Sequence, residues 1–402
     1  MKHLLSLIAL STTVVLRAQT FTTYGTGQGL PNLDVRDVAV APDGKIWVAT
    51  AAGIASFDGT TFNTYSVGSH PTFLNDDTYA IEVLDNGDVW VGTDFGLSVL
   101  QGSTFTNYTT ANGLSDNEIK NIKQAPNGDV WIATINGATR FSASTFTAFG
   151  SPSIPFGGTT HVAFAGNGDV LLSGGLGGMI VFNGSTFSAV TTAGGLLSNR
   201  LRSIVVNNAQ ERWVATADGI SVLSASNAHI VDHETVFILP PPDELNPITD
   251  LVIDAYGRIW AGVYVDYLVT VGGVSVYTDG VWDQYDESDG LAGPNVRRLA
   301  ADANSIWVAT STGLTRISDI NIGVEEREAA SFRLSPNPAS AFVDVSLDQA
   351  VSTTVEVLDS RGRIVIGARA NGQRQRIDVS MLQPGLYLLR VGVQSVRFVV
   401  ER

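Results

Sequence analysis

The chain has 402 residues, 41 of which are glycine, and only 16% of its residues are charged. Its formal net charge of -15 argues against a nucleic-acid ligand, because phosphates require a basic protein surface. It contains no cysteine, which excludes disulfides, thiolate metal sites, a cysteine nucleophile and a lipid-modified N-terminal cysteine.

Residues 1–18 are predicted to be a signal peptide. Lys2 and His3 form a short polar start, residues 4–16 are largely apolar, and cleavage is expected after Ala18. No later stretch approaches the roughly 18 consecutive apolar residues that a membrane-spanning helix needs. We therefore expect no transmembrane segment in the mature chain.

A repeated segment dominates residues 19–317. Its clearest copy is DNGDVWVGTDFGL at residues 85–97. The central tryptophan, or leucine in one degenerate copy, recurs at positions 47, 90, 131, 171, 213, 260 and 307. The spacings are 43, 41, 40, 42, 47 and 47 residues. A period of about 40–45 residues with several short strands is typical of a β-propeller.

One repeat shows how the strands are expected to follow each other. Strands are predicted at residues 35–40, 46–50, 54–57 and 61–65, with turns at 43–44 and 58–59 where Asp-Gly supplies a positive φ. Four antiparallel strands make one propeller blade. The recurrent tryptophan is expected to pack between neighbouring blades, because stacked sheets need large apolar anchors.

Ring closure can be predicted by counting the outer strands. Six are expected, at residues 61–65, 104–108, 145–149, 186–190, 235–239 and 281–285. The seventh repeat ends near Ile317 without one, and the matching segment is residues 20–24. Pairing the two ends in one blade removes an exposed sheet edge. We predict an all-β fold, a seven-bladed β-propeller closed by the N-terminal outer strand.

The repeats resemble the two-component-regulator propeller family. Its pattern is D-x-x-G-x-[LI]-W-[IV]-[GA]-T-x-x-G-[LI] followed by F-x-x-Y and D/N-G-L-x-x-N-x-[VI], and residues 85–97 with 105–119 match it closely. The resemblance covers residues 20–317. It implies either the sensor portion of a hybrid histidine kinase or a free-standing surface protein. No membrane helix, kinase or DNA-binding segment follows in this sequence, which favours the second.

Residues 318–331 are predicted to be a polar linker, and residues 332–402 a small Ig-like β-sandwich. Strands are expected at 342–347, 354–358 and 386–391, with a turn at 359–363. The motifs S-P-N-P at 335–338, V-x-V-x-D-x-x-G-R at 355–363 and L-x-P-G-x-Y-x-L-R-V at 382–391 resemble the type A C-terminal sorting domain of the Bacteroidetes type IX secretion system. This resemblance implies passage through the outer membrane by the type IX machinery, removal of residues 332–402, and release or surface attachment.

The loops on one face of the propeller are the first candidate binding surface. Residues 264–269 are an insertion in the sixth repeat, and residues 240–247 form a proline-rich acidic connection. Variable loops on a rigid scaffold commonly carry recognition. The candidates are Phe95, Tyr264, Asp266 and Tyr267, with ordinary loop variation as the alternative.

The mouth of the axial channel is the second candidate. An asparagine precedes most first strands and is expected to bind loop backbone; these residues are Asn32, Asn75, Asn117, Asn199, Asn246 and Asn295. Alignment on the tryptophan marker then places seven residues at the mouth: Arg36, Tyr79, Lys120, Thr160, Arg202, Thr249 and Arg298. Four cations in an acidic chain suggest an anion site, for a carboxylated or sulfated glycan. The alternative pairs these cations with carboxylates such as Asp34 and Asp37.

Catalysis has little support in the sequence. No Ser-His-Asp order, P-loop or HExxH is present, and His229 and His233 on one strand are not expected to bind metal. Seven-bladed rings of this kind also resemble streptogramin lyases, which need a histidine near the channel; His70 and His161 fall in or beside the loop-face connections. His161 is a weak candidate base, and no cofactor is expected. We predict a binding protein for a glycan or an envelope protein, with an extracellular lyase or hydrolase and a structural adhesin or matrix protein as alternatives.

Overall fold

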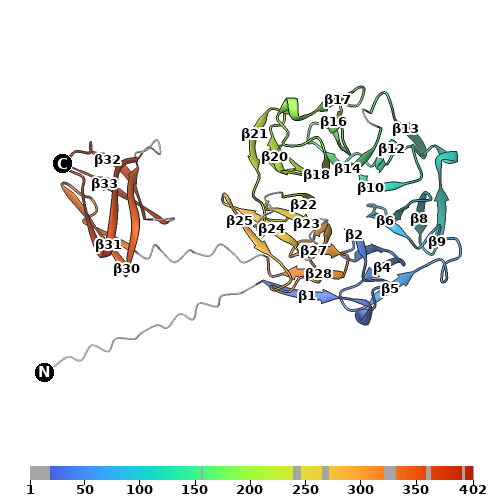
Figure 1. Cartoon of the computed structure of the whole chain (residues 1–402), viewed down its shortest axis with the longest axis horizontal. Coiled ribbons are helices and arrows are strands. Elements are labelled where there is room, and N and C mark those ends of the chain that lie inside the picture. Colours follow the sequence, from blue (N-terminus) through green and yellow to red (C-terminus); the bar gives the residue numbers. More distant parts are fainter. Residues whose placement is uncertain are drawn as a thin grey trace. The chain divides into compact units, whose positions relative to one another are not determined.

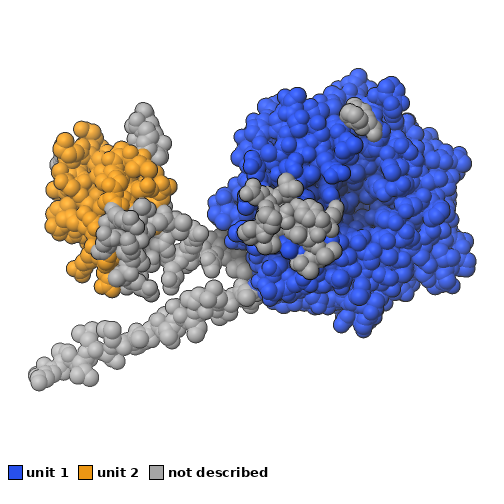
Figure 2. Space-filling model, viewed as in Figure 1, with its two compact units in different colours: residues 1–321 blue, residues 322–402 orange. Residues whose placement is uncertain are grey.

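The computed structural model describes residues 19–154, 157–238, 246–264, 271–320, 332–358, 364–391 and 394–401. The chain forms two compact units, Met1–Asn321 and Ile322–Arg402 (Figure 2). In these described ranges the regular structure is β-strand, apart from the short 3-10 helices η1 (Thr26–Gln28), η2 (Thr110–Asn112) and η3 (Thr192–Gly194). Among the same residues, no helix has the length and apolar character needed to cross a bilayer.

The first unit consists of four-stranded antiparallel sheets, seven in its described part. The inner strands are β2 (Val35–Val40), β6 (Thr78–Val83), β10 (Ile119–Gln124), β14 (Thr159–Phe164), β18 (Leu201–Val206), β22 (Ile248–Ile253) and β26 (Val296–Ala301). The second strands are β3 (Ile46–Thr50), β7 (Val89–Thr93), β11 (Val130–Thr134), β15 (Val170–Gly174), β19 (Arg212–Thr216), β23 (Ile259–Tyr264) and β27 (Ser305–Thr310).

The third strands are β4 (Gly53–Phe57), β8 (Leu97–Gln101), β12 (Gly137–Ser142), β16 (Gly178–Phe182), β20 (Gly219–Leu223), β24 (Gly272–Thr278) and β28 (Gly313–Ser318). The outer strands are β5 (Phe62–Tyr65), β9 (Thr104–Tyr108), β13 (Thr145–Phe149), β17 (Phe187–Val190), β21 (His229–His233), β25 (Val281–Tyr285) and β1 (Thr20–Tyr24). The predicted outer strand at 235–239 is wrong, because β21 lies six residues earlier and pairs with β20.

The sheets follow one another around a common centre (Figure 1). Each inner strand contacts the inner strands of the sheets on either side, and β2 contacts both β6 and β26. β1 pairs antiparallel with β28, with Thr20 opposite Ser318 and Tyr24 opposite Leu314. One sheet therefore combines the N-terminal strand with the last three strands of the unit.

The marker tryptophans pack between neighbouring sheets, as predicted. The ring centroid of Trp90 on β7 lies 5.2 Å from that of Phe141 on β12, in the following sheet. Trp213 and Tyr277 make the same kind of contact at 5.3 Å. These contacts form the apolar layers between sheets, and aromatic pairs at this separation stabilise such layers beyond their area of burial.

The T-x-x-G part of each repeat fixes the hairpin between second and third strands. Thr93 Oγ1 donates a hydrogen bond to the Gly96 carbonyl at 2.9 Å. Gly96 has a φ of 135°, and a Cβ there would also meet the Tyr108 carbonyl oxygen of the outer strand. The same threonine-to-glycine bond occurs at Thr50, Thr134, Thr216 and Thr310. These hairpins are therefore held rigidly around one end of the ring.

The second unit is a five-stranded antiparallel sheet in the described residues. Its strands are β29 (Phe332–Ser335), β30 (Phe342–Leu358), β31 (Ile364–Asp378), β32 (Gly385–Val391) and β33 (Gln394–Val400). Apolar side chains such as Val343, Leu389 and Phe398 form its core. The two strands predicted at 342–347 and 354–358 are one continuous strand, β30, and the predicted turn at 359–363 lies outside the described residues. The Ig-like sandwich stays a prediction.

Candidate functional site

The asparagines before the inner strands do bind loop backbone. Asn32 Oδ1 accepts a hydrogen bond from the Asp34 amide at 2.8 Å, and Asn75 Oδ1 accepts one from the Asp77 amide at 2.6 Å. Asn117, Asn199 and Asn246 accept comparable bonds. The prediction is confirmed for these five residues, which fix the chain just before it enters five of the seven inner strands described.

A β-bulge occurs at the start of every inner strand described. In each one the register with the second strand shifts across a single residue. These skipped positions, called the bulge residues here, are Arg36, Tyr79, Lys120, Thr160, Arg202, Thr249 and Arg297. A bulge leaves its extra residue outside the ladder and re-aims that side chain. Seven side chains are thereby presented at one end of the channel.

All the bulge residues line one cavity of about 460 Å³, the channel mouth. Its lining includes six cationic side chains, which are Arg36, Lys120, Arg200, Arg202, Arg297 and Arg298. The described residues that line it include no aspartate or glutamate. In a chain with a net charge of -15, six cations are thereby gathered on one concave surface.

The sequence alignment misplaced one of these residues. Arg297, not Arg298, occupies the bulge position of β26, because Val296 pairs with Thr310 and Arg298 with Ala309. The hairpin between β26 and β27 is one residue shorter than that between β2 and β3. Arg298 also lines the mouth but lies one residue deeper. Arg200 is a further lining residue that repeat alignment did not identify.

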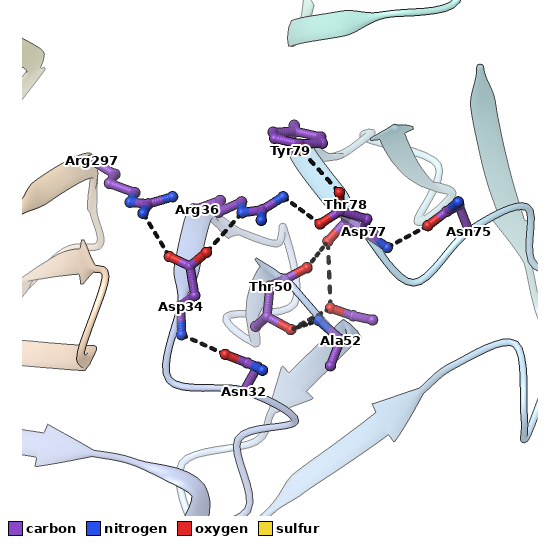
Figure 3. Close-up of polar contacts among 11 residues, drawn as sticks. Asn32, Asp34, Arg36, Thr50, Ala52, Asn75, Asp77, Thr78, Tyr79 and Arg297 are labelled. Carbon is purple, nitrogen blue, oxygen red and sulfur yellow. Dashed lines mark hydrogen bonds and ion pairs between the residues drawn. The ribbon is translucent and has the colours of Figure 1, made fainter. Parts of the chain in front are cut away.

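Ion pairs hold part of the mouth in place (Figure 3). Arg36 donates to Asp34 at 3.0 Å and to Asp77 at 2.6 Å. Arg297 reaches the other oxygen of Asp34 at 2.8 Å, and the Tyr79 hydroxyl donates to Asp77 at 2.9 Å. The alternative pairing with Asp34 is thus correct for Arg36. A guanidinium has five N–H donors, so these bonds orient both arginines without using all their donors.

Tyr79 forms a flat aromatic element within the mouth. The Arg36 guanidinium lies 4.2 Å from its ring centroid, and Lys120, which also pairs with Glu118, lies 5.4 Å away. Burial and the hydrogen bond to Asp77 raise the pKa of Tyr79 to about 12. Tyr79 is therefore a neutral phenol at physiological pH and cannot act as a base there.

The four residues predicted on the loop face do not lie together in one described site. Tyr264 lines the mouth. Phe95 lies in the hairpin between β7 and β8 with 59% of its surface exposed, and Ile135 and Leu176 are similarly exposed in the next two hairpins. Asp266 and Tyr267 lie outside the described residues. The sequence did not single out Ile135 or Leu176, although they lie in the hairpins that correspond to that of Phe95.

One residue deeper than the bulges, polar side chains join adjacent inner strands. These residues, called the polar ring here, are Asp37, Asn121, His161, Ser203 and Asp250, and each accepts a backbone N–H from the next inner strand. The Asp37 bond to the Ile81 amide is 2.9 Å, and the Asp250 bond to the Leu299 amide is 2.8 Å. A buried bond of this kind couples neighbouring sheets directly around the channel.

His161 belongs to this ring and not to a loop-face connection, which corrects its predicted place. It lies within β14 with 7% of its surface exposed, and its Nδ1 accepts from the Ile204 amide at 3.4 Å. Burial, with the positive charges of Arg298 and Lys123, lowers the pKa of His161 well below its usual range. The neutral imidazole acts as a hydrogen-bond acceptor between sheets. His70 lies in the β5–β6 connection, where Nδ1 is 2.9 Å from Ser69 Oγ.

The polar ring makes stability depend on pH. Burial raises the pKa of Asp37 to about 6, although Arg298 and Lys123 oppose this shift. The folded carboxyl thus binds its proton more tightly than the unfolded one, so its stabilising contribution is full below about pH 3.8 and is lost as pH rises through 6. Urea unfolding measures the free energy of unfolding of Asp37→Asn and of the unsubstituted chain. The variant's value minus that of the unsubstituted chain should rise by about 3 kcal/mol between pH 3.5 and 7.5. A difference that is constant across this range would contradict the assignment.

The histidines of β21 do not assemble a metal centre. His229 Nε2 lies 3.0 Å from Asp232 Oδ2. Within the described ranges, no three histidine, aspartate or glutamate side chains are grouped so that they could hold a metal ion.

Comparisons with known protein families match both parts of the chain. The model for the secretion system C-terminal sorting domain matches residues 333–401, and that for the two component regulator propeller matches residues 113–136. Both predicted resemblances are confirmed. The sorting domain points to export across the outer membrane, to the cell surface or the extracellular space. No curated protein shows a significant match to the chain.

Solved structures share the propeller fold at low identity. The extracellular domain of the hybrid two component system BT3049 from B. thetaiotaomicron is 17% identical with a TM-score of 0.64; the match covers 96% of this chain and 58% of that one. A catalytically inactive virginiamycin B lyase from Staphylococcus aureus, with quinupristin, is 15% identical with a TM-score of 0.58, over 75% of this chain and 99% of the lyase. These likenesses establish the fold and carry no activity over.

Proposed function

We propose that the protein is a surface-displayed or secreted binding protein whose channel mouth holds an anionic group of a glycan. In this proposal residues 19–317 form a seven-bladed propeller closed by β1, and residues 332–402 form the Ig-like module that engages the type IX secretion machinery. The observation that carries the proposal is the cavity with six cations and no carboxylate among its described lining residues.

The bulges explain why the positive charge is concentrated. They place one side chain from each sheet on the same ring, so four of seven repeat positions add their charges at one point: Arg36, Lys120, Arg202 and Arg297. Guanidinium groups match carboxylate and sulfate geometry with two parallel hydrogen bonds. Tyr79 adds an aromatic face of the kind on which a sugar ring can rest. The ion pairs of Arg36 and Arg297 leave guanidinium N–H donors that an anionic ligand can use.

No observation favours the lyase or hydrolase alternative. His161 uses Nδ1 as an acceptor for a backbone amide, and its Nε2 faces Ser203 Oγ at 3.5 Å. An envelope protein with an acidic surface segment would satisfy the same charges and is the main competitor. The two ligand classes are separated by experiment.

The purified chain should be screened against an array of acidic and neutral glycans at low and moderate salt. We expect binding to carboxylated or sulfated glycans, weakening steeply as salt rises, because exposed charges are screened within about 10 Å at 0.1 M salt. Neutral glycans should not bind. If no acidic glycan binds, or if binding does not change with salt, a glycan ligand at the mouth is contradicted. An acidic protein partner would then be the next ligand class to test.

A further inference from the structure

The channel does not end at the mouth. A second cavity of about 320 Å³ is lined by polar-ring residues, including Asp37, Asn121, His161 and Asp250. Arg298 lines both cavities, so the two are adjacent along the channel. The last residues of four inner strands, Gln124, Phe164, Val206 and Ile253, form the far part of its lining, with Lys123 beside Gln124. A ligand entering at the mouth would thus meet cations first, then the polar ring, and then a surface of mixed apolar and polar side chains.

Two buried polar atoms in this lower cavity lack a protein partner. Asp250 is 3% exposed, and although Oδ2 accepts from the Leu299 amide, Oδ1 has no hydrogen-bond partner. The Nε of Arg298 is also buried without one. Leaving such groups unsatisfied costs about 1–3 kcal/mol each, so a bound molecule that satisfies them gains affinity. One unpaired acceptor and one unpaired donor are therefore built into the same cavity.

The charge at the entrance restricts what can satisfy these atoms. An ammonium group could donate to Asp250, but it would have to approach through the cationic mouth, which repels it. A hydroxyl group carries no charge, and it can both donate to a carboxylate oxygen and accept from a guanidinium N–H. Hydroxyls below an anionic group are the arrangement found in a sugar acid.

We propose that the channel takes the chain end of an acidic glycan, with the terminal sugar's carboxylate at the bulge arginines and its hydroxyls bonded to Asp250 Oδ1 and Arg298 Nε. This inference rests on the proposed function and specifies it: the protein binds one end of a uronic-acid chain. An internal segment could lie across the mouth but could not reach Asp250.

Titration calorimetry with galacturonate oligomers of three and about twelve residues tests the end-on mode. Binding to one end predicts one protein per oligomer at both lengths. Asp250→Asn keeps an oxygen for the Leu299 amide and replaces the unpaired acceptor by a donor, so it should weaken binding of trigalacturonate about tenfold. It should not weaken binding of tricarballylate, which has three carboxylates and no hydroxyl, because the substitution removes a negative charge from the channel. Asp88→Asn is the matched control, because Asp88 is partly exposed in the hairpin between β6 and β7, at the end of the strands away from the mouth.

Each outcome decides between the two proposals. The end-on inference fails if more proteins bind to the longer oligomer, if Asp250→Asn binds trigalacturonate normally, or if only tricarballylate binds. In those cases anion binding at the mouth still stands, provided that Arg297→Gln weakens it. If the unsubstituted chain binds neither compound nor any acidic glycan on the array, the proposed function itself fails.

Discussion

Replacing Arg36, Arg202 and Arg297 together by glutamine is expected to weaken binding of an acidic glycan about a thousandfold. A charge-assisted hydrogen bond is worth about 1.5 kcal/mol, so three are worth about 4.5 kcal/mol, and each 1.4 kcal/mol is tenfold in Kd. The three residues come from β2, β18 and β26, so the substitutions remove one positive charge from each of three inner strands at the mouth. Calorimetry or fluorescence titration at low salt measures the change.

The matched control replaces Lys45, Arg140 and Arg316 by glutamine. Replacing three cations gives this variant the same change in net charge as the first one. Because these residues lie outside the mouth, the variant should keep its affinity within about twofold. The dependence of affinity on salt should also flatten in the first variant and not in the control. Equal losses in both variants would mean that total charge, and not the mouth, attracts the glycan.

The repeat pattern predicted the strands well because the hydrophobic alternation and the Asp-Gly turns act locally. The markers at Trp90 and Trp213 could be placed between sheets for the same reason. The outer strand β21 was misplaced because its HIVDH segment lacks the aromatic spacing of the other outer strands. Pairing with β20 selects that segment, and pairing is not visible in local composition.

The candidate site was harder to predict because it depends on register. Alignment on the tryptophan marker identified six of the seven bulge positions and failed at Arg297, where the hairpin to β27 is one residue shorter. Arg297 takes the bulge position, and Arg298 lies one residue deeper, where it lines both the mouth and the second cavity. Nothing local marks a bulge, since it arises from how two strands pair.

The polar ring could not be predicted either. Asp37, Asn121 and His161 differ in chemistry, so one sequence does not show them as equivalent. They share only a geometric role, which is to accept an amide from the next inner strand. His161 was a candidate base because streptogramin lyases need a histidine near the channel and His161 was expected beside a loop-face connection. Its role as a hydrogen-bond acceptor follows from its burial and from its contact with the Ile204 amide, neither of which the residue type reveals.

Deleting residues 19–24 is expected to lower the free energy of unfolding by at least about 5 kcal/mol. β1 pairs with β28 along its whole length, and its side chains reach two neighbouring sheets. The Tyr24 ring lies 5.9 Å from Trp307 in its own sheet and 5.0 Å from Phe57 in the next, and Phe21 lies 5.6 Å from Tyr285. Loss of one large buried aromatic side chain costs about 3–5 kcal/mol, and the deletion removes two partly buried ones and exposes the edge of β28.

Urea unfolding followed by tryptophan fluorescence reports this loss, because Trp307 lies beside the deleted strand. Replacing the outward Thr22 and Thr23 by alanine is the control, since both side chains are exposed and should change stability by less than about 1 kcal/mol. A synthetic peptide of residues 19–25 added to the deleted chain should restore part of the stability, because it can pair with β28 and place Tyr24 against Trp307 again. If the deletion costs no more than the threonine substitutions, β1 does not close the ring, and the sheets are held together by the polar ring and the tryptophan layers alone.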